Sequence, residues 1–230
     1  MQDQPPEGSP PENNPPEGSP PQSPLPAPAA CDGTMDLVRV LDPRLDEAIG
    51  HVARESIRQG LLRGVPLRIE PERYPDPLRQ HCASFVTLHR NGQLRGCIGV
   101  LDPQRPLVED VAQNAFAAAF RDPRFEPLDP LECHDLTISI SLLSDHEPLN
   151  CSSEAEFLMK LRPGVDGVVL EWSGGRGTFL PAVWQTLPDT GEFIRQLKVK
   201  AGLAPEQWPS DLQAKRYTTR MIGPLPYESQ

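Results

Sequence analysis

FVTLHRNGQLRGCIGV, residues 85–100, consists of two apolar runs joined by Asn91-Gly92. A two-residue type I′ turn needs a positive φ at both central positions, and Asn-Gly satisfies this better than almost any other pair. The segment therefore predicts an antiparallel β-hairpin. Because hairpins of this kind build antiparallel sheets, the rest of the fold is expected to assemble around it.

The two-residue loop also predicts the register of the hairpin. With Asn91-Gly92 as the loop, Leu88 is expected opposite Arg95, and Val86 opposite Cys97. One face then carries Val86, Leu88, Arg95 and Cys97, and the other carries Phe85, Thr87, His89, Leu94, Ile98 and Val100. Both faces are largely apolar, which predicts a hairpin in the middle of a sheet that is covered on both sides.

The second run, residues 94–99, is unusual for a strand because it contains Gly96 and Gly99 as well as Arg95 and Cys97. Arg95 shares a predicted face with Cys97, and a nearby cation favours a thiolate. We therefore take Cys97 and Arg95 as candidate catalytic residues of a thiol nucleophile or redox centre. The alternative is an inert buried thiol, with glycines that let another element approach closely.

The remaining elements follow from caps and periodicity. Asp42 and Pro43 are typical of a helix start, and residues 136–142 alternate strictly between apolar and polar side chains. Helices are expected over residues 42–60, 106–120, 153–161 and 190–201, strands over 136–142 and 215–222, and a second hairpin from 165–172 to 178–184. Frequent hairpins without regular helix–strand alternation favour an α+β fold with antiparallel sheets and packed helices.

Residues 1–36 differ from the rest of the chain in composition. They are rich in proline and acidic residues, lack Lys and Arg, and repeat the heptapeptide PPEGSPP at 5–11 and 15–21. Such a segment has too few apolar side chains to offset the entropy of ordering. We expect residues 1–36 to be a disordered acidic Pro-rich tail and residues 37–230 to form the folded domain.

The composition also limits the possible partners and compartments. The net charge is −10 and no basic run occurs, which argues against nucleic-acid binding. No apolar stretch approaches 18 residues and no secretory signal is visible, so no membrane span is expected. Five cysteines, an odd number in a chain of 230 residues, are typical of reduced thiols in the cytoplasm.

The sequence contains other groups of reactive side chains. His81-Cys82 and Cys133-His134 lack the usual spacing of zinc ligands, so we expect no metal and no other cofactor. A Cys-His-Asp hydrolase could be assembled from Cys97, His134 and Asp135, but no strand-turn-helix elbow presents the thiol. This hydrolase remains the enzymatic alternative.

Several separated segments resemble one known family. Leu94-Arg95-Gly96-Cys97-Ile98-Gly99 matches the signature hexapeptide of the AMMECR1 domain family, whose bacterial and archaeal members are called AmmeMemoRadiSam system protein A. Similar segments follow in the family's order at 122–127, 136–143, 164–168 and 179–184. The resemblance covers roughly residues 40–222.

The resemblance carries its own expectations. It implies an α+β fold with two closely packed subdomains. We expect the chain to be a monomer or weak dimer. The resemblance also implies that Asp122 and Arg124 line a binding cleft with Arg95, Gly96 and Gly99. The family's name links it to a Memo-like protein and a radical SAM protein, which implies an accessory or binding role in a redox or modification system.

Overall fold

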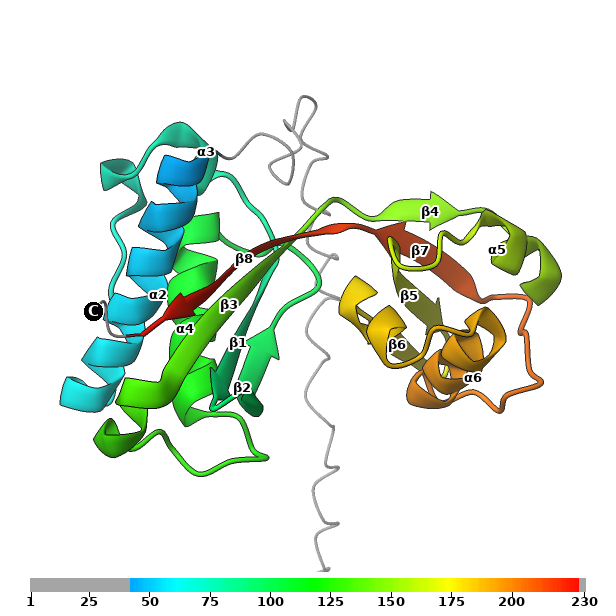
Figure 1. Cartoon of the computed structure of the whole chain (residues 1–230). Coiled ribbons are helices and arrows are strands. Elements are labelled where there is room, and N and C mark those ends of the chain that lie inside the picture. Colours follow the sequence, from blue (N-terminus) through cyan, green and yellow to red (C-terminus); the bar gives the residue numbers. More distant parts are fainter. Residues whose placement is uncertain (1–41, 228–230) are drawn as a thin grey trace, which may run out of the picture. The chain divides into compact units, whose positions relative to one another are not determined.

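The computed structural model describes residues 42–227, so the tail predicted for residues 1–36 lies outside the described residues. Two four-stranded antiparallel sheets form this part of the chain (Figure 1). The first has the order β2-β1-β3-β8, with β1 at Ser84–Arg90, β2 at Gln93–Gly99, β3 at Leu136–Leu143 and β8 at Thr219–Pro226. The second has the order β4-β7-β5-β6, with β4 at Glu147–Leu149, β5 at Gly167–Trp172, β6 at Gly175–Phe179 and β7 at Gln213–Tyr217. The predicted α+β class with two subdomains is confirmed.

Two long helices cover one face of the first sheet (Figure 1). Helix α2 (Pro43–Arg63) begins as predicted, because the Asp42 carboxylate accepts hydrogen bonds from two amides of the first turn. It continues past the predicted end at Gly60 and stops at Gly64, which has a φ of 69°. A Cβ at Gly60 would overlap the ring of Phe120 on helix α4 (Leu107–Phe120). Gly60 is therefore the point where the two helices pack closely.

The main core lies between these helices and the first sheet. The alternation predicted for residues 136–142 is confirmed, since Ile138, Ile140 and Leu142 of β3 are fully buried. They pack in one cluster with Val86 and Leu88 of β1 and with the apolar faces of α2 and α4. Complete burial of such a side chain stabilises the fold by roughly 1.5–3 kcal/mol.

The predicted register of the first hairpin is right next to the turn, where His89 pairs with Leu94, and wrong farther from it. Asn91 and Gly92 have φ angles of 51° and 75°, as the predicted turn requires. However, Thr87 pairs with Cys97 and Leu88 with Gly96, because a β-bulge interrupts the ladder between Leu88 and His89. One extra residue in β2 exchanges the faces of everything beyond it. Cys97 therefore shares a face with Thr87, not with Val86.

The position of this hairpin in the sheet also differs from the prediction. Only β1 is central, whereas β2 is an edge strand. Gly96 of β2 turns toward the helices, and a Cβ there would overlap the backbone carbonyl of Ala118 in α4. The close approach of another element that the glycines suggested is thus confirmed at Gly96.

The second sheet has its own core and helices. Helices α5 (Glu154–Lys160) and α6 (Thr190–Lys200) begin near the predicted residues, and Phe193 and Leu197 of α6 are fully buried. The second hairpin turns more tightly than predicted, since Trp172 pairs with Gly175. Its second strand ends at Phe179, because Pro181 begins a 3₁₀ helix (Pro181–Gln185). Shorter elements that were not predicted are 3₁₀ helices at Pro71–Arg73 and Pro130–Asp135 and a short helix α3 at Asp76–Arg79.

The last predicted strand is two strands that belong to different sheets. Strand β7 ends at Tyr217 in the second sheet and β8 begins at Thr219 in the first, so the chain crosses at Thr218. The connection from β3 to β4 crosses in the other direction. Ser144 and Thr218 hydrogen-bond to each other at this point, with two N···O distances of 2.9 Å. None of the helices between residues 42 and 227 is long and apolar enough to cross a membrane.

Candidate functional site

Asp122 joins the end of helix α4 to the edge strand β2. The helix stops at Phe120, and the Asp122-Pro123 turn directs the Asp122 carboxylate to the backbone amide of Cys97, which donates a 2.9 Å hydrogen bond. The carboxylate also accepts 2.9 and 2.6 Å hydrogen bonds from Nε and Nη2 of Arg124. Its side chain is 2% exposed. The Arg124 guanidinium holds the pKa of Asp122 well below its usual range.

Arg124 completes this contact with the strand. Its Nη2 atom donates a 3.3 Å hydrogen bond to the carbonyl oxygen of Cys97. Both backbone polar groups of Cys97 are therefore bound by one ion pair, although Cys97 lies on an edge strand. Side chains that occupy an edge in this way prevent its pairing with another chain. The structure brings Gly96, Cys97, Asp122 and Arg124 together, while Gly99 lies against Phe85 of β1.

Arg95 has a different contact from the one expected. Its Nε and Nη2 atoms each donate a 2.8 Å hydrogen bond to Glu132, and Nη2 also binds the carbonyl oxygen of Glu126. Arg90 adds a 3.2 Å contact to the same carboxylate. The Arg95 hydrogen bonds lower the pKa of Glu132 to about 2. The charge of Arg95 is thus balanced by a carboxylate.

The Cys97 thiol is half-buried and has a neutral hydrogen-bond donor. Thr87 on β1 donates its hydroxyl hydrogen to the sulfur over 3.3 Å. The cation in electrostatic contact with Cys97 is Arg124, whose pKa is raised first by Asp122 and further by Cys97. His134 is bound to the carbonyl oxygen of Leu131 and to Asp135 at 2.8 and 2.7 Å. No hydrogen bond within residues 42–227 joins His134 to Cys97, so the hydrolase arrangement is not assembled here.

An aromatic ring lies close to both arginines of the site. The guanidinium carbons of Arg95 and Arg124 lie 5.8 and 5.5 Å from the centroid of the Phe125 ring. Two exposed apolar residues adjoin the residues of the site in sequence: Leu94 precedes Arg95 and Leu131 precedes Glu132, and they are 41% and 80% exposed. We call Leu94, Arg95, Arg124, Phe125 and Leu131 the Phe125 surface.

Sequence reasoning did not identify Glu132 or Phe125 as parts of the site. Glu132 had a usable signal, because Asp129-Pro130-Leu131-Glu132 is a capping box. The Asp129 amide donates to Glu132 over 2.9 Å, which fixes the carboxylate that binds Arg95. The contact of Phe125 with two cations depends on residues from two separate segments and has no local signal.

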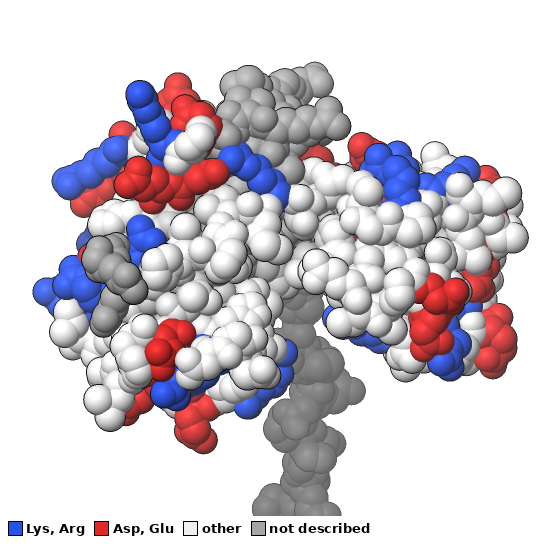
Figure 2. Space-filling view, viewed as in Figure 1, with Lys and Arg blue, Asp and Glu red and all other residues white. Residues whose placement is uncertain are grey.

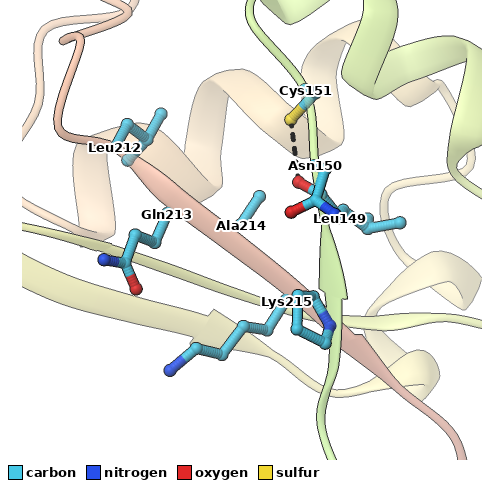
Figure 3. A pocket seen from close by; sticks show the side chains of 8 residues that line it. Leu149, Asn150, Cys151, Leu212, Gln213, Ala214 and Lys215 are labelled. Carbon is cyan, nitrogen blue, oxygen red and sulfur yellow. Dashed lines mark hydrogen bonds between the residues drawn. The ribbon is translucent and has the colours of Figure 1, made fainter.

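Among residues 42–227, no group of three or more His, Cys, Asp or Glu side chains is arranged to hold a metal ion. A cavity of about 330 Å³ lies on the second sheet, between β4 and the start of β7. Figure 3 shows the Leu149, Leu212 and Lys215 side chains there pointing in different directions. The Cys151 thiol in its wall donates to the Leu149 carbonyl, and burial raises its pKa.

The surface charges are mixed on the face drawn in Figure 2, where Lys and Arg alternate with Asp and Glu and much of the area is uncharged. A nucleic-acid interface needs a concentrated positive field, because phosphate contacts supply most of its affinity. The drawn face has no such area.

Comparisons with known proteins point to one family. The family model described as AMMECR1 matches residues 50–222. A protein from Methanothermobacter thermautotrophicus is 40% identical over 158 residues, which is 67% of this chain and 81% of that protein. A protein from Thermococcus gammatolerans is 36% identical over 185 residues, covering 76% of this chain and 88% of that protein.

A solved structure is similar over nearly its full length. It is the crystal structure of the uncharacterized protein PH0010 from Pyrococcus horikoshii, which is 32% identical in sequence. The match has a TM-score of 0.71 and covers 79% of this chain and 92% of the other. The likeness therefore includes both sheets and not the first hairpin alone.

Proposed function

Because this chain belongs to the AMMECR1 family, we propose that it is an accessory binding protein of a system that also contains a Memo-like protein and a radical SAM protein. The resemblance to AmmeMemoRadiSam system protein A supplies the class of partner. The chain would act in the cytoplasm as a monomer or weak dimer.

The Phe125 surface is the observation that carries this proposal. It combines an aromatic ring that is in contact with two guanidinium groups with exposed leucines at 94 and 131. Aromatic and arginine side chains are enriched at the energetic centres of protein interfaces, and exposed apolar side chains beside them add buried area. The hydrogen bonds of Asp122 and Arg124 to Cys97 keep the supporting strand fixed. A preorganised surface loses less entropy on binding.

The contacts around the thiol favour binding over catalysis. Arg95, the expected activator, is neutralised by Glu132, and Arg124 is neutralised by Asp122. A thiol nucleophile usually needs a neighbouring base or an uncompensated cation. The Phe125 surface needs neither, since it acts through shape and exposed area.

Leu131→Asp tests the binding role. Leu131 is 80% exposed, so the substitution leaves the core intact, but it places a charge where a partner would bury apolar area. We expect the dissociation constant for the purified Memo-like or radical SAM protein of the same organism to rise at least about tenfold, which is about 1.4 kcal/mol. Isothermal titration calorimetry measures it.

Met159→Asp is the matched control, because Met159 is equally exposed but lies on α5 beside the second sheet. It should leave the affinity unchanged. Failure of the native chain to bind either protein would contradict the proposed partnership. Equal weakening by both substitutions would contradict the assignment to the Phe125 surface.

A thiol-dependent enzyme that uses Cys97 is the second candidate, and one contact favours it. The hydroxyl of Thr87 donates to the sulfur, and hydrogen bonding to a charged form favours that form. On this hypothesis, iodoacetamide should label Cys97 faster than a cysteine of the unfolded chain near neutral pH. Thr87→Val, which keeps the shape and removes the donor, should abolish the difference.

Peptide mass spectrometry separates the labelling of Cys97 from that of the other cysteines. Absence of labelling at Cys97 in the native protein would remove the enzymatic candidate. Cys97→Ala then distinguishes the roles further, because a binding protein should keep its affinity for the partner without the thiol, whereas a thiol enzyme should lose its activity.

A further inference from the structure

The two sheets meet at a small interface within residues 42–227. Its apolar part contains Ala83, Leu143, Val169 and Tyr217. Beside it, Arg176 of β6 binds Asp102 through two hydrogen bonds of 2.7 and 3.1 Å. Asp102 follows the end of β2 at Gly99 by three residues. The ion pair therefore ties the segment after the LRGCIG strand to the second sheet.

His146 lies at this interface, two residues beyond the crossing at Ser144. Its side chain is 15% exposed, and its ring centroid is 5.2 Å from that of Tyr217. Its Nδ1 atom is 3.9 Å from the nearer carboxylate oxygen of Asp102, beyond hydrogen-bond distance. Its Nε2 atom is buried and has no hydrogen-bond partner among the described residues. The closed interface thus leaves one imidazole nitrogen buried without a partner, and this burial disfavours the charged ring more than Asp102 favours it.

Four charged side chains act on His146, and they belong to different parts of the two sheets. They are Asp102 after β2, the adjacent Asp145, Arg176 on β6 and Lys215 on β7. Lys215 is itself 3.4 Å from Glu171 of β5, and the Tyr217 hydroxyl is directed to Thr178 and the carbonyl of Phe179. Burial lowers the pKa of His146, and Arg176 and Lys215 lower it further against the opposing effect of Asp102.

The contact between the sheets depends on pH because its open and closed states bind a proton with different affinities. Separation of the sheets would expose His146 to water, where its pKa returns to about 6.5. The open state then binds a proton more readily than the closed state, so the closed state is fully favoured above this pH and loses stability as the pH falls below it.

We propose that His146 makes the contact between the two sheets pH-responsive, so that its protonation releases Asp102 from Arg176 and loosens the segment that follows the LRGCIG strand. The device is independent of the partner proposed above, because it involves neither the Phe125 surface nor Cys97. Acidification would loosen residues 100–106, which directly follow the edge strand β2.

Hydrogen exchange followed by mass spectrometry tests the proposal on the intact chain. After correction for intrinsic rates, exchange in residues 100–106 and 173–178 should accelerate several-fold between about pH 7.5 and about pH 5.5, since each unit of pKa difference contributes at most about tenfold. His146→Phe keeps an aromatic ring against Tyr217 but cannot titrate. It should show the same corrected rates at both pH values.

Two further variants separate the mechanism from a general acid effect. Arg176→Gln removes the ion pair and should exchange rapidly in these segments at both pH values. His51→Gln, which removes an exposed histidine on α2, should retain the wild-type response. The proposal is overturned if wild-type exchange in these segments is independent of pH, or if His146→Phe keeps the response.

Discussion

Asp110→Ala is expected to lower the free energy of unfolding by about 3 kcal/mol. The Asp110 side chain is 1% exposed, and one of its oxygens accepts hydrogen bonds from the Ser84 amide, the Ser84 hydroxyl and the Asn114 amide at 3.0, 2.6 and 2.8 Å. Alanine would leave these buried donors without their acceptor and Arg105 without its carboxylate. Thermal unfolding should shift down by about 6–12 °C.

Asp110→Asn separates the charge from the hydrogen bonds. Burial raises the pKa of Asp110, so the ionised carboxylate is costly to keep in place. Asparagine removes that cost and retains one oxygen acceptor, so it should destabilise less than alanine does. Glu109→Ala, one residue earlier on α4 and more exposed, should change stability by less than about 0.5 kcal/mol. If Asp110→Ala lowered the free energy of unfolding as little as Glu109→Ala does, the hydrogen-bond network of Asp110 would not stabilise the fold.

Local signals predicted the elements that depend on neighbouring residues. The Asn91-Gly92 turn, the helix start at Asp42 and the alternation over residues 136–142 are all confirmed. Each depends on backbone preferences or on a period within a few residues. The two-subdomain α+β fold came from the resemblance and from the frequency of hairpins.

Features that depend on distant residues were not predictable in this way. The bulge in β2 lies beside Arg95, whose carboxylate partner is 37 residues away. The Ser84–Asp110 contact spans 26 residues. The division of one apparent strand at Thr218 depends on which sheet each half joins. No periodicity in the sequence encodes such pairings, because they are decided by tertiary packing.

The candidate site likewise contains contacts that were expected beforehand and contacts that were not. Asp122 and Arg124 were associated with Arg95, Gly96 and Gly99 only by the resemblance, and the structure brings them into direct contact with Cys97 of the same strand. The expected pairing of Arg95 with the thiol assumed an uninterrupted ladder. The bulge and the Glu132 carboxylate instead give Arg95 a different partner, which the sequence alone could not reveal.

Gly96→Ala is expected to lower the free energy of unfolding by an amount comparable to that of Asp110→Ala. This substitution lies in the candidate site itself. A Cβ at Gly96 would overlap the carbonyl oxygen of Ala118, which is helix backbone and cannot rotate away as a side chain would. Ala118 and Ala119 are already buried against the sheet, so α4 cannot shift without opening the main core. Overpacking of this kind costs roughly 1–3 kcal/mol, and relief requires β2 to move away from the helix.

That movement would also disturb the contact between Cys97 and Asp122. Because Asp122 follows directly after α4, displacement of β2 should break the hydrogen bond from the Cys97 amide. We expect chemical unfolding to report a loss of about 2–3 kcal/mol, and hydrogen exchange to report lost protection of the Cys97 amide.

Gly191→Ala provides the matched control, because it makes the same substitution in the first turn of α6, where the nearest contact to a Cβ is the capping Asp189 side chain at 3.3 Å and not helix backbone. Alanine is favoured over glycine in a helix by up to about 1 kcal/mol, so this variant should be as stable as the native protein or slightly more stable. If Gly96→Ala were equally well tolerated and kept the Cys97 amide protected, close packing could not explain Gly96. The glycine would then have to be accounted for by what binds at the edge strand.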